Sequence, residues 1–508
     1  MVESPYPVLE GAPYFNFQSR HFLIEGAYQI IPTKPIEVGH TRQLLMDNHV
    51  VDSTWNCFRK VHQPDKYADN PVIEPTDALR TSAEGSVLYD DEQHRFRLWG
   101  FSNHRTRAKF DMNAVHVTYE SEDGIDWTAP ELGIVEDEGS TANNIFQGGK
   151  GLIFASVSVV EVPQRLRSRG RYAMLYGFGR EQLAPGELHA NEQRIAWSDD
   201  GLHWRDQPEN PVFRGRSDTD NNMEYNPQRN VFMMYRRATV NAHEIRRIAY
   251  SESKDLIAWT QPQVILDADS LDAPMLYGMT VTRYQGVYLG FLQMFYGANA
   301  GYKTGPRLWR DGRVEKFQQV DIQLAWSRDG VHWERHPQRP IFLPTGVHGV
   351  DMDWGLVYMD QGIVEHGDRL HLYYRGGNRL HNQPSAKMTT HLATLRRDGF
   401  VSLGTPEVGP GPGYMLTRPL ACPGGKLHIN ARTEAGGLVR VAVRSGDGAA
   451  DGDWLDGWNF EDGAPFIGDA TDAILEWQGS ENFDVLEGRS IRLHFWLQKA
   501  ELYSFWFA

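Results

Sequence analysis

The hydrophobic positions of this chain alternate with polar positions over short runs, which is the period of a β-strand rather than of an α-helix. Two such runs flank a polar turn in "MEYNPQRNVFMMYRR" (223–237), and again in "YGMTVTRYQGVYLGFLQMF" (277–295). Comparable pairs of runs lie at 85–101, 151–179 and 362–377. Few segments have a helical period, so the pattern predicts an all-β chain built from hairpins.

A phrase that ends in tryptophan follows most of these pairs. It reads "AWSDDGLHW" at 196–204, and similar phrases lie at 118–128, 249–260 and 325–335. A weaker version at 392–403 keeps Asp-Gly but lacks the tryptophan. Asp-Gly between two apolar strand ends predicts a hairpin, because glycine adopts positive φ at low cost. Since the phrase recurs at the outer edge of each unit, we interpret it as a hairpin and Trp wedge that pack one unit against the next.

These patterns combine into one repeating unit of four strands. The units are about 50 to 80 residues long, and five of them fit between about 80 and 400, which predicts a five-bladed β-propeller over 41–404. A β-sandwich of many hairpins explains this regular recurrence less well. After a Gly/Pro-rich connector, alternating strand patterns predict a small antiparallel β-sandwich over 405–508. Residues 1–40 have no core of their own and are expected to be an arm packed on the propeller.

Composition narrows the classes of partner. The net charge of −15 and the pI of about 5.7 argue against nucleic acid or an anionic membrane as a partner. No signal peptide or transmembrane run is visible, so we expect a cytoplasmic protein, and a homo-oligomer stays open. Cys57 and Cys422 have no metal-binding spacing, and we expect neither a metal nor a cofactor. The 15 Trp and 49 Gly are typical of a β-rich, turn-rich chain, often one that binds sugars.

Acids and amides gather where the innermost strands are expected to begin. In a propeller, the loops that enter these strands form the mouth of a central funnel. Cleavage of a glycosidic bond needs two carboxyl groups there, one of them kept protonated by its surroundings. The catalytic candidates are Glu224, Asp353, Asp272, Glu84 and Asp220.

Other polar and aromatic residues at the same positions are candidates for contacts with the sugar, by hydrogen bonding or by ring stacking. The expected substrate-binding residues are Asp218, Asn221, Asn144, Arg237, His243, Tyr277, His348, Trp354 and Tyr358. Asn143 and Asn144 are expected to open the second blade.

The blades that begin in carboxylates, the outer hairpins and the appended sandwich resemble the five-bladed propeller glycosidases, including glycoside hydrolase families 43 and 32. The resemblance implies three acids on separate inner strands. "EYNPQRNVFMMY" (224–235) is similar to the segment that carries the general acid in those families, which implies this role for Glu224. The Trp-Asn-Asp-Pro-Asn-Gly and Arg-Asp-Pro motifs of invertases are absent, so the resemblance assigns no residue to the other two roles.

The leading hypothesis is therefore a glycoside hydrolase that removes sugar units from the end of a glycan. A non-catalytic carbohydrate-binding propeller is the alternative from another class. A glycan phosphorylase or transglycosylase also stays open, since Arg237, His243 and Arg375 could bind phosphate. A lyase would use Tyr277 or Tyr358 with His348.

Overall fold

Two compact units make up the chain in the computed structural model: a repeat domain, Val61–Arg397, and a terminal domain, Met1–Lys60 with Asp398–Ala508. The structure describes residues 34–75, 84–103, 114–148, 152–179, 191–214, 221–239, 246–272, 275–296, 318–381, 387–406, 411–446, 453–479 and 482–508. Over these ranges the regular structure is β-strand, with two short 3-10 turns at Gln164–Leu166 and Asp484–Leu486 and no α-helix. The all-β prediction is confirmed.

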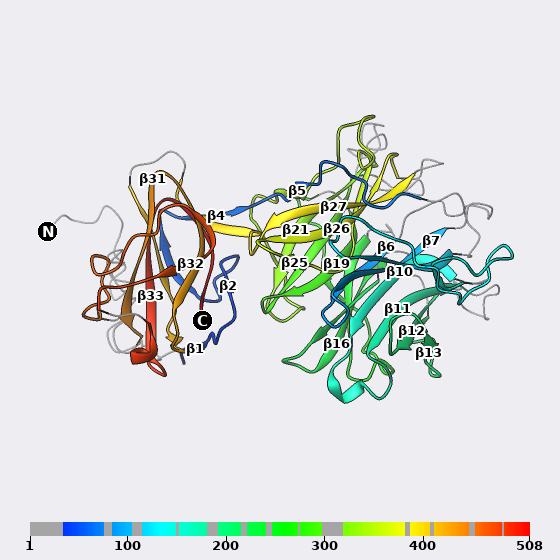
Figure 1. The fold of residues 1–508 in the computed structure, drawn as a ribbon, viewed down its shortest axis with the longest axis horizontal. Helices are drawn as coiled ribbons and strands as arrows, with labels where there is room; N and C mark the ends of the chain where they lie inside the picture. Colours follow the sequence, from blue (N-terminus) through cyan, green and yellow to red (C-terminus); the bar gives the residue numbers. More distant parts are fainter. Residues whose placement is uncertain are drawn as a thin grey trace, which may run out of the picture. The chain divides into compact units, whose positions relative to one another are not determined.

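The repeat domain contains five groups of antiparallel strands within the described ranges (Figure 1). The first group is β6 (Glu84–Asp90), β7 (Arg95–Asn103), β8 (Ala114–Ser121) and β9 (Ile145–Gln147); the second is β10 (Leu152–Glu161), β11 (Tyr172–Gly179) and β12 (Asn191–Ser198), with β13 (Arg205–Asp206) and β14 (Phe213–Arg214) beside β12. The third is β15 (Asn222–Asn226), β16 (Val231–Thr239), β17 (Arg246–Ser253) and β18 (Gln263–Leu266).

The last two groups share one sheet. The fourth is β19 (Met275–Tyr284), β20 (Val287–Phe295) and β21 (Val320–Ser327), with β22 (Glu334–Arg335) and β23 (Ile341–Leu343) beside β21. The fifth is β24 (Leu356–Met359) and β25 (Val364–His366), which both pair with β26 (Arg369–Gly377), then β27 (Met388–Arg396) and β5 (Asp65–Lys66). Because β5 precedes the first group in sequence, the beginning and the end of the domain meet in one sheet.

Hydrogen bonds join the first strands of the five groups in a ring. In each bond a side-chain oxygen of one segment accepts a backbone N–H of its neighbour, so buried backbone donors are satisfied without sheet pairing. The bonds are Val159 N to Ser86 Oγ (2.9 Å), Met223 N to Ser158 Oγ (2.8 Å), Val281 N to Asn222 Oδ1 (2.9 Å), Gly362 N to Thr282 Oγ1 (3.0 Å) and Gly85 N to Asp360 Oδ1 (3.0 Å). The last of these connects the fifth group to the first.

Gln361 fills the middle of this ring. Its Nε2 donates to the carbonyl of Met223 (2.8 Å), and its Oε1 accepts from the hydroxyls of Ser86 (3.0 Å) and Ser158 (2.6 Å). The side chain is buried, and it binds β6, β10 and β15 at once. One amide therefore ties three groups together.

The recurring phrase forms a local hydrogen-bonded hairpin. In "AWSDDGLHW" the Ser198 hydroxyl donates to Asp200 (3.0 Å) and accepts from the N–H of Gly201 (2.8 Å). The carbonyl of Gly201 accepts from the indoles of Trp204 (3.0 Å) and of Trp99 in the neighbouring group (2.6 Å). The same Ser–Asp bond occurs in the other three copies. The interpretation of the phrase as a structural contact between units is confirmed.

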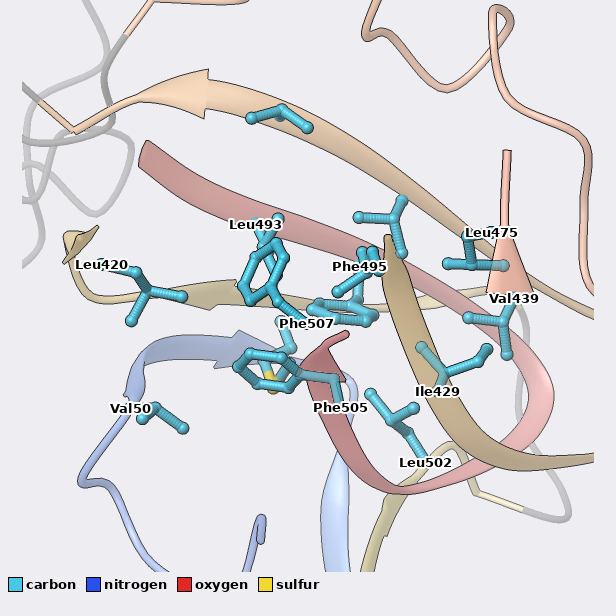
Figure 2. Close-up of a cluster of buried hydrophobic side chains, with 14 of the residues drawn as sticks. Val50, Leu420, Ile429, Val439, Leu475, Leu493, Phe495, Leu502, Phe505 and Phe507 are labelled. Carbon is cyan, nitrogen blue, oxygen red and sulfur yellow. The ribbon is translucent and has the colours of Figure 1, made fainter. Parts of the chain in front are cut away.

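The terminal domain is one sheet by hydrogen bonding, and it folds around a single core. Its strands are β1 (Ile36–Glu37), β2 (Gln43–Leu44), β3 (Val51–Trp55), β4 (Phe58–Val61), β28 (Val401–Gly404), β29 (Gly413–Thr417), β30 (Leu420–Ala421), β31 (Leu427–Ser445), β32 (Asp469–Leu475) and β33 (Ser490–Phe507). Figure 2 shows core side chains from both halves of β33, with Phe495 before its bend and Phe505 after it.

The domain boundary predicted from the sequence needs a correction. Residues 41–60 were expected in the propeller, but β2 pairs with β33 and β3 pairs with β29. In the described part of the predicted arm, β1 pairs with β30. These segments therefore belong with the C-terminal strands. The pairing joins residues more than 350 positions apart, so no local pattern reveals it.

Candidate functional site

Aromatic and arginine side chains gather at the leading end of the first strands, which is where β19 and β24 begin. The ring centres of Tyr277 and Tyr358 are 5.6 Å apart. The guanidinium carbons of Arg237 and Arg246 lie 5.3 and 4.7 Å from the centre of the Tyr277 ring, within the range of cation–π attraction. The structure thus brings together three of the predicted binding residues, Arg237, Tyr277 and Tyr358.

Two further residues complete this leading-end cluster. The Tyr277 hydroxyl and the Nε2 atom of His381 share a hydrogen bond of 2.8 Å. The guanidinium carbon of Arg375 lies 5.0 Å from the centre of the Tyr358 ring. Burial lowers the pKa of Arg375 to about 9, because removal from water disfavours its charged form. The cluster therefore combines flat rings with hydrogen-bond donors and partly desolvated cations.

A cavity of about 400 Å³ lies at the opposite, trailing end, where the first strands finish. Residues from all five groups line it. The polar ones include Asp90, Glu161, Arg171, Glu224, Arg283 and Gln361, and the aromatic ones include Trp99 and Tyr172. Because Gln361 also fills the ring of first strands, it forms part of the wall of this trailing-end cavity.

Glu224 is the carboxyl group of the cavity whose pKa lies close to neutral pH. Its Oε1 accepts the N–H of Tyr225 (2.8 Å), and its Oε2 accepts the N–H of Arg283 on β19 (3.1 Å). Burial raises the pKa of the carboxyl to about 7, although the two backbone N–H groups and the Arg283 charge act in the opposite direction. A carboxyl with such a pKa is partly protonated near neutral pH and can donate a proton.

Two other carboxylates line the same cavity beside an arginine. Arg171 Nε donates to Glu161 (3.1 Å), and Arg171 NH2 lies 3.7 Å from Asp90. Asp90 also accepts the N–H groups of Glu92 (3.0 Å) and Gln93 (3.2 Å). The Arg171 guanidinium thus lies beside both carboxyl groups. The cavity therefore holds Glu224, whose pKa is raised to about 7, and two acidic side chains next to an arginine.

Two of the predicted catalytic acids lie elsewhere, in ion pairs. Asp272 accepts two hydrogen bonds of 2.8 Å from Arg335 on β22, at the edge of the fourth group. Asp353 is 2 % exposed and accepts from Lys66 Nζ (2.6 Å) and from the Tyr374 hydroxyl (2.9 Å) within the fifth group. Neither residue lines the trailing-end cavity. Their contacts are those of structural ion pairs.

Asn144 is not where the sequence placed it. It was expected at the start of the second blade, but it precedes β9, the fourth strand of the first group. Its amide donates to the carbonyl of Thr118 (2.8 Å), and Asn143 likewise caps the same loop. The strand pattern after the Asp-Gly hairpin had been assigned to the next unit, although it completes the first one.

The remaining predicted site residues do not lie together in one place. His348 and Trp354 lie in the loop before β24 with their ring centres 4.2 Å apart, and His348 is exposed. Asn221 is buried directly before β15. Glu84 begins β6, and only its main chain is described. Asp218, Asp220 and His243 lie outside the described residues.

Sequence reasoning missed Asp90, Glu161 and Arg171. Asp90 and Glu161 are the last residues of β6 and β10, whereas the sequence led us to expect the site at the beginnings of such strands. A charged residue at the end of a predicted first strand was the available signal. Burial also raises the pKa of Asp321 on β21 to about 7, but this residue does not line the cavity.

Within the described ranges, no three His, Cys, Asp or Glu side chains are placed to hold a metal ion together. No helix there has the length and apolar character needed to span a membrane.

No family model matches the chain, and no curated protein matches it. Among solved structures, it is similar to a glycosyl hydrolase from Bacteroides ovatus at 13% identity, with a TM-score of 0.42 and coverage of 66% of this chain and 94% of that one. It is also similar to an N-acetylgalactosamine deacetylase from F. plautii (15%, 0.43, 67% and 96%) and to a GH32 β-fructofuranosidase from Bombyx mori (11%, 0.42, 88% and 93%).

The likeness to glycoside hydrolases that the sequence suggested is thus present in the structure, at low identity.

Proposed function

We propose that the repeat domain is a five-bladed propeller and that the protein is a carbohydrate-active enzyme, specifically a glycoside hydrolase. The five groups of strands, the ring of hydrogen bonds between their first strands and the closing strand β5 support the propeller. A closed propeller has no long unpaired sheet edge, which suits a soluble catalytic scaffold.

The observation that carries the activity is Glu224, a carboxyl group with a pKa of about 7 that faces a cavity with two carboxylates. In the proposed reaction, Glu224 donates its proton to the glycosidic oxygen as the bond to the anomeric carbon breaks. Glu161 accepts a proton from the attacking water, because its side chain is 48% exposed and can reach solvent. Gln361 closes one side of the cavity, which supports release of sugar units from a chain end.

Replacement of the acid tests the proposal. Glu224→Gln keeps the size of the side chain but has no proton to donate, so we expect hydrolysis to fall by about 100-fold or more. The assay is release of nitrophenol from a panel of aryl glycosides, together with release of sugars from oligosaccharides. Glu209→Gln, at an exposed position, is the control. Unchanged activity of Glu224→Gln would refute the proposed site.

Phosphorolysis is a second candidate, favoured by the three arginines of the leading-end cluster. Guanidinium groups bind phosphate through paired, charge-assisted hydrogen bonds. Under this alternative, the bond is cleaved at the leading-end cluster and not in the trailing-end cavity. Sugar 1-phosphate then forms only when inorganic phosphate is present, and Arg375→Gln raises the phosphate concentration needed for half-maximal rate. Sugar release at the same rate without phosphate excludes this candidate.

A further inference from the structure

The outer face of the terminal-domain sheet carries a row of aromatic rings. Trp55 on β3, Tyr414 on β29 and Trp496 on β33 are cross-strand neighbours, with ring centres 6.0 and 5.7 Å apart along the row. His494, two residues before Trp496, lies 5.7 Å from Tyr414. Since side chains alternate along a strand, Phe495 points to the other face, where it belongs to the core.

Trp454 extends this row beyond β31. Its main chain is fixed beside that strand, because Ser445 N donates to Asp453 O (2.7 Å) and Leu455 N donates to Val443 O (3.1 Å). The Trp454 ring stacks on His494, with centres 5.5 Å apart and planes at 17°.

Trp454 is held in place by its neighbours and is still partly exposed. The guanidinium carbon of Arg444 lies 4.3 Å from the centre of its ring. The residue is nevertheless 44% exposed. Contacts with Arg444 and His494 thus fix the orientation of the indole, and part of it remains in contact with water.

Trp55 is exposed as well, by 62%. Together with Phe460, whose ring centre lies 5.7 Å from that of Trp454 and 5.7 Å from that of Trp496, these residues form an aromatic platform. The platform is defined as Trp55, Tyr414, Trp454, Phe460, His494 and Trp496. Tryptophan left in water at two places of one connected surface indicates a surface that binds a ligand.

We propose that the aromatic platform binds a neutral glycan chain. The C–H faces of a sugar ring are flat and apolar and stack on aromatic rings, while its hydroxyl rim forms hydrogen bonds. Arg440, Arg444 and Asp453 adjoin the rings and can supply those bonds. No deep pocket is needed, because an extended chain lies along a flat surface.

Charge favours a neutral glycan over the other occupants of such a surface. A second copy of this chain brings a further net charge of −15, and a polyanion is repelled in the same way. The site goes beyond the proposed hydrolase activity and does not depend on it.

The full-length chain is tested by affinity electrophoresis in gels that contain xylan or mannan, as neutral pentose and hexose polymers. The wild-type protein is expected to be retarded by at least one of them. Trp454→Ala is expected to weaken this retardation by about tenfold or more, the effect of losing one aromatic stack. Ile474→Ala, which is also 44% exposed and lies on β32 outside the platform, is the matched control and should bind like the wild type.

Three results would overturn the proposal: no retardation by either polymer, equal retardation of Trp454→Ala and the wild type, or a wild-type dimer that Trp454→Ala converts to a monomer in sedimentation velocity. Glu224→Gln separates this proposal from the hydrolase, because it should be retarded like the wild type. If Glu224→Gln keeps full activity while Trp454→Ala loses binding, only the proposed hydrolase site fails.

Discussion

Glu224 holds a carboxyl group in surroundings that oppose its ionisation. Glu224 lies on the five-residue strand β15, which also carries Asn222. The Asn222 and Glu224 side chains both accept backbone N–H groups of β19, so the hydrogen bonds that join the two groups of strands also fix the position of the carboxyl group. Burial favours the protonated form of the carboxyl group. The folded protein is therefore less stable at pH values at which this group is ionised. Burial of Glu224 thus has two effects: it makes the carboxyl group a proton donor near neutral pH, and it lowers the stability of the fold when that group is ionised.

This cost predicts a pH dependence of stability. Burial raises the pKa of Glu224 from 4.5 to about 7, so between these values the unfolded chain loses a proton that the folded chain keeps. The unfolding free energy should therefore fall as pH rises through this window, by about 1–3 kcal/mol for a partly buried group. Glu224→Gln should remove this component. Urea unfolding of both proteins from pH 4.5 to 8 measures it, and identical pH profiles would contradict the prediction.

At the scale of single residues, the sequence proposed Glu224, Arg237, Tyr277 and Tyr358 as site candidates. The structure places Glu224 in the wall of the trailing-end cavity and the other three in the leading-end cluster. The sequence could not separate them from Asp272 and Asp353. Each of those acids also precedes a predicted first strand, but its partner is a distant cation, Arg335 or Lys66. The choice between a catalytic and a paired carboxylate therefore depends on tertiary contacts that a local pattern does not contain.

Some elements of this fold are held by contacts between residues close in sequence, and others by contacts between distant residues. The hairpins of the recurring phrase are stabilised by bonds between residues two or three positions apart, which explains why the sequence predicted the three copies with Asp-Gly. In the copy at 249–260, Leu256 occupies the position of the glycine with φ +62°, and the Ser253–Asp255 bond is kept. Strands β1 to β3 gave no such signal, since their partners are at the other end of the chain. Short segments with distant partners account for the misplaced domain boundary.

The hairpin of the second group gives a prediction at this scale. Gly201 has φ +77°, and a Cβ there would lie 2.7 Å from the Trp99 ring. Gly286 has φ +76° with nothing within 4 Å of such a Cβ. Both Gly→Ala changes incur about 1 kcal/mol of backbone strain, and Gly201→Ala should cost about 1–3 kcal/mol more from the displaced indole. Chemical unfolding followed by tryptophan fluorescence compares the two. Equal losses of stability would show that the hairpin does not need close contact with Trp99.

On the scale of the whole molecule, both domains are completed by segments from the beginning of the chain. The terminal domain takes β1 to β4, and the repeat domain takes β5 as the last strand of its fifth group. The sequence predicted the number of four-stranded units from their repeats. It did not predict the pairing of β5 with β27, because the two residues of β5 carry no pattern of their own. The ion pair of Lys66 with Asp353 anchors that short strand.

Removal of this anchor should weaken the repeat domain. Lys66→Met leaves Asp353, which is 2 % exposed, without its cation, and a buried charge that loses its partner destabilises the fold. Because Lys66 is itself partly exposed, we expect a loss of about 2–4 kcal/mol in the free energy of unfolding.

Lys387→Met is the control, since Lys387 forms a pair of 2.7 Å with Glu74 in which the side chains are 42% and 59% exposed. That change should cost less than about 1 kcal/mol. Urea unfolding measures both, and Lys66→Met/Asp353→Asn should recover part of the loss by removing the buried charge. If Lys66→Met is no more destabilising than Lys387→Met, β5 does not depend on this pair, and Asp353 regains its place among the candidates for catalysis.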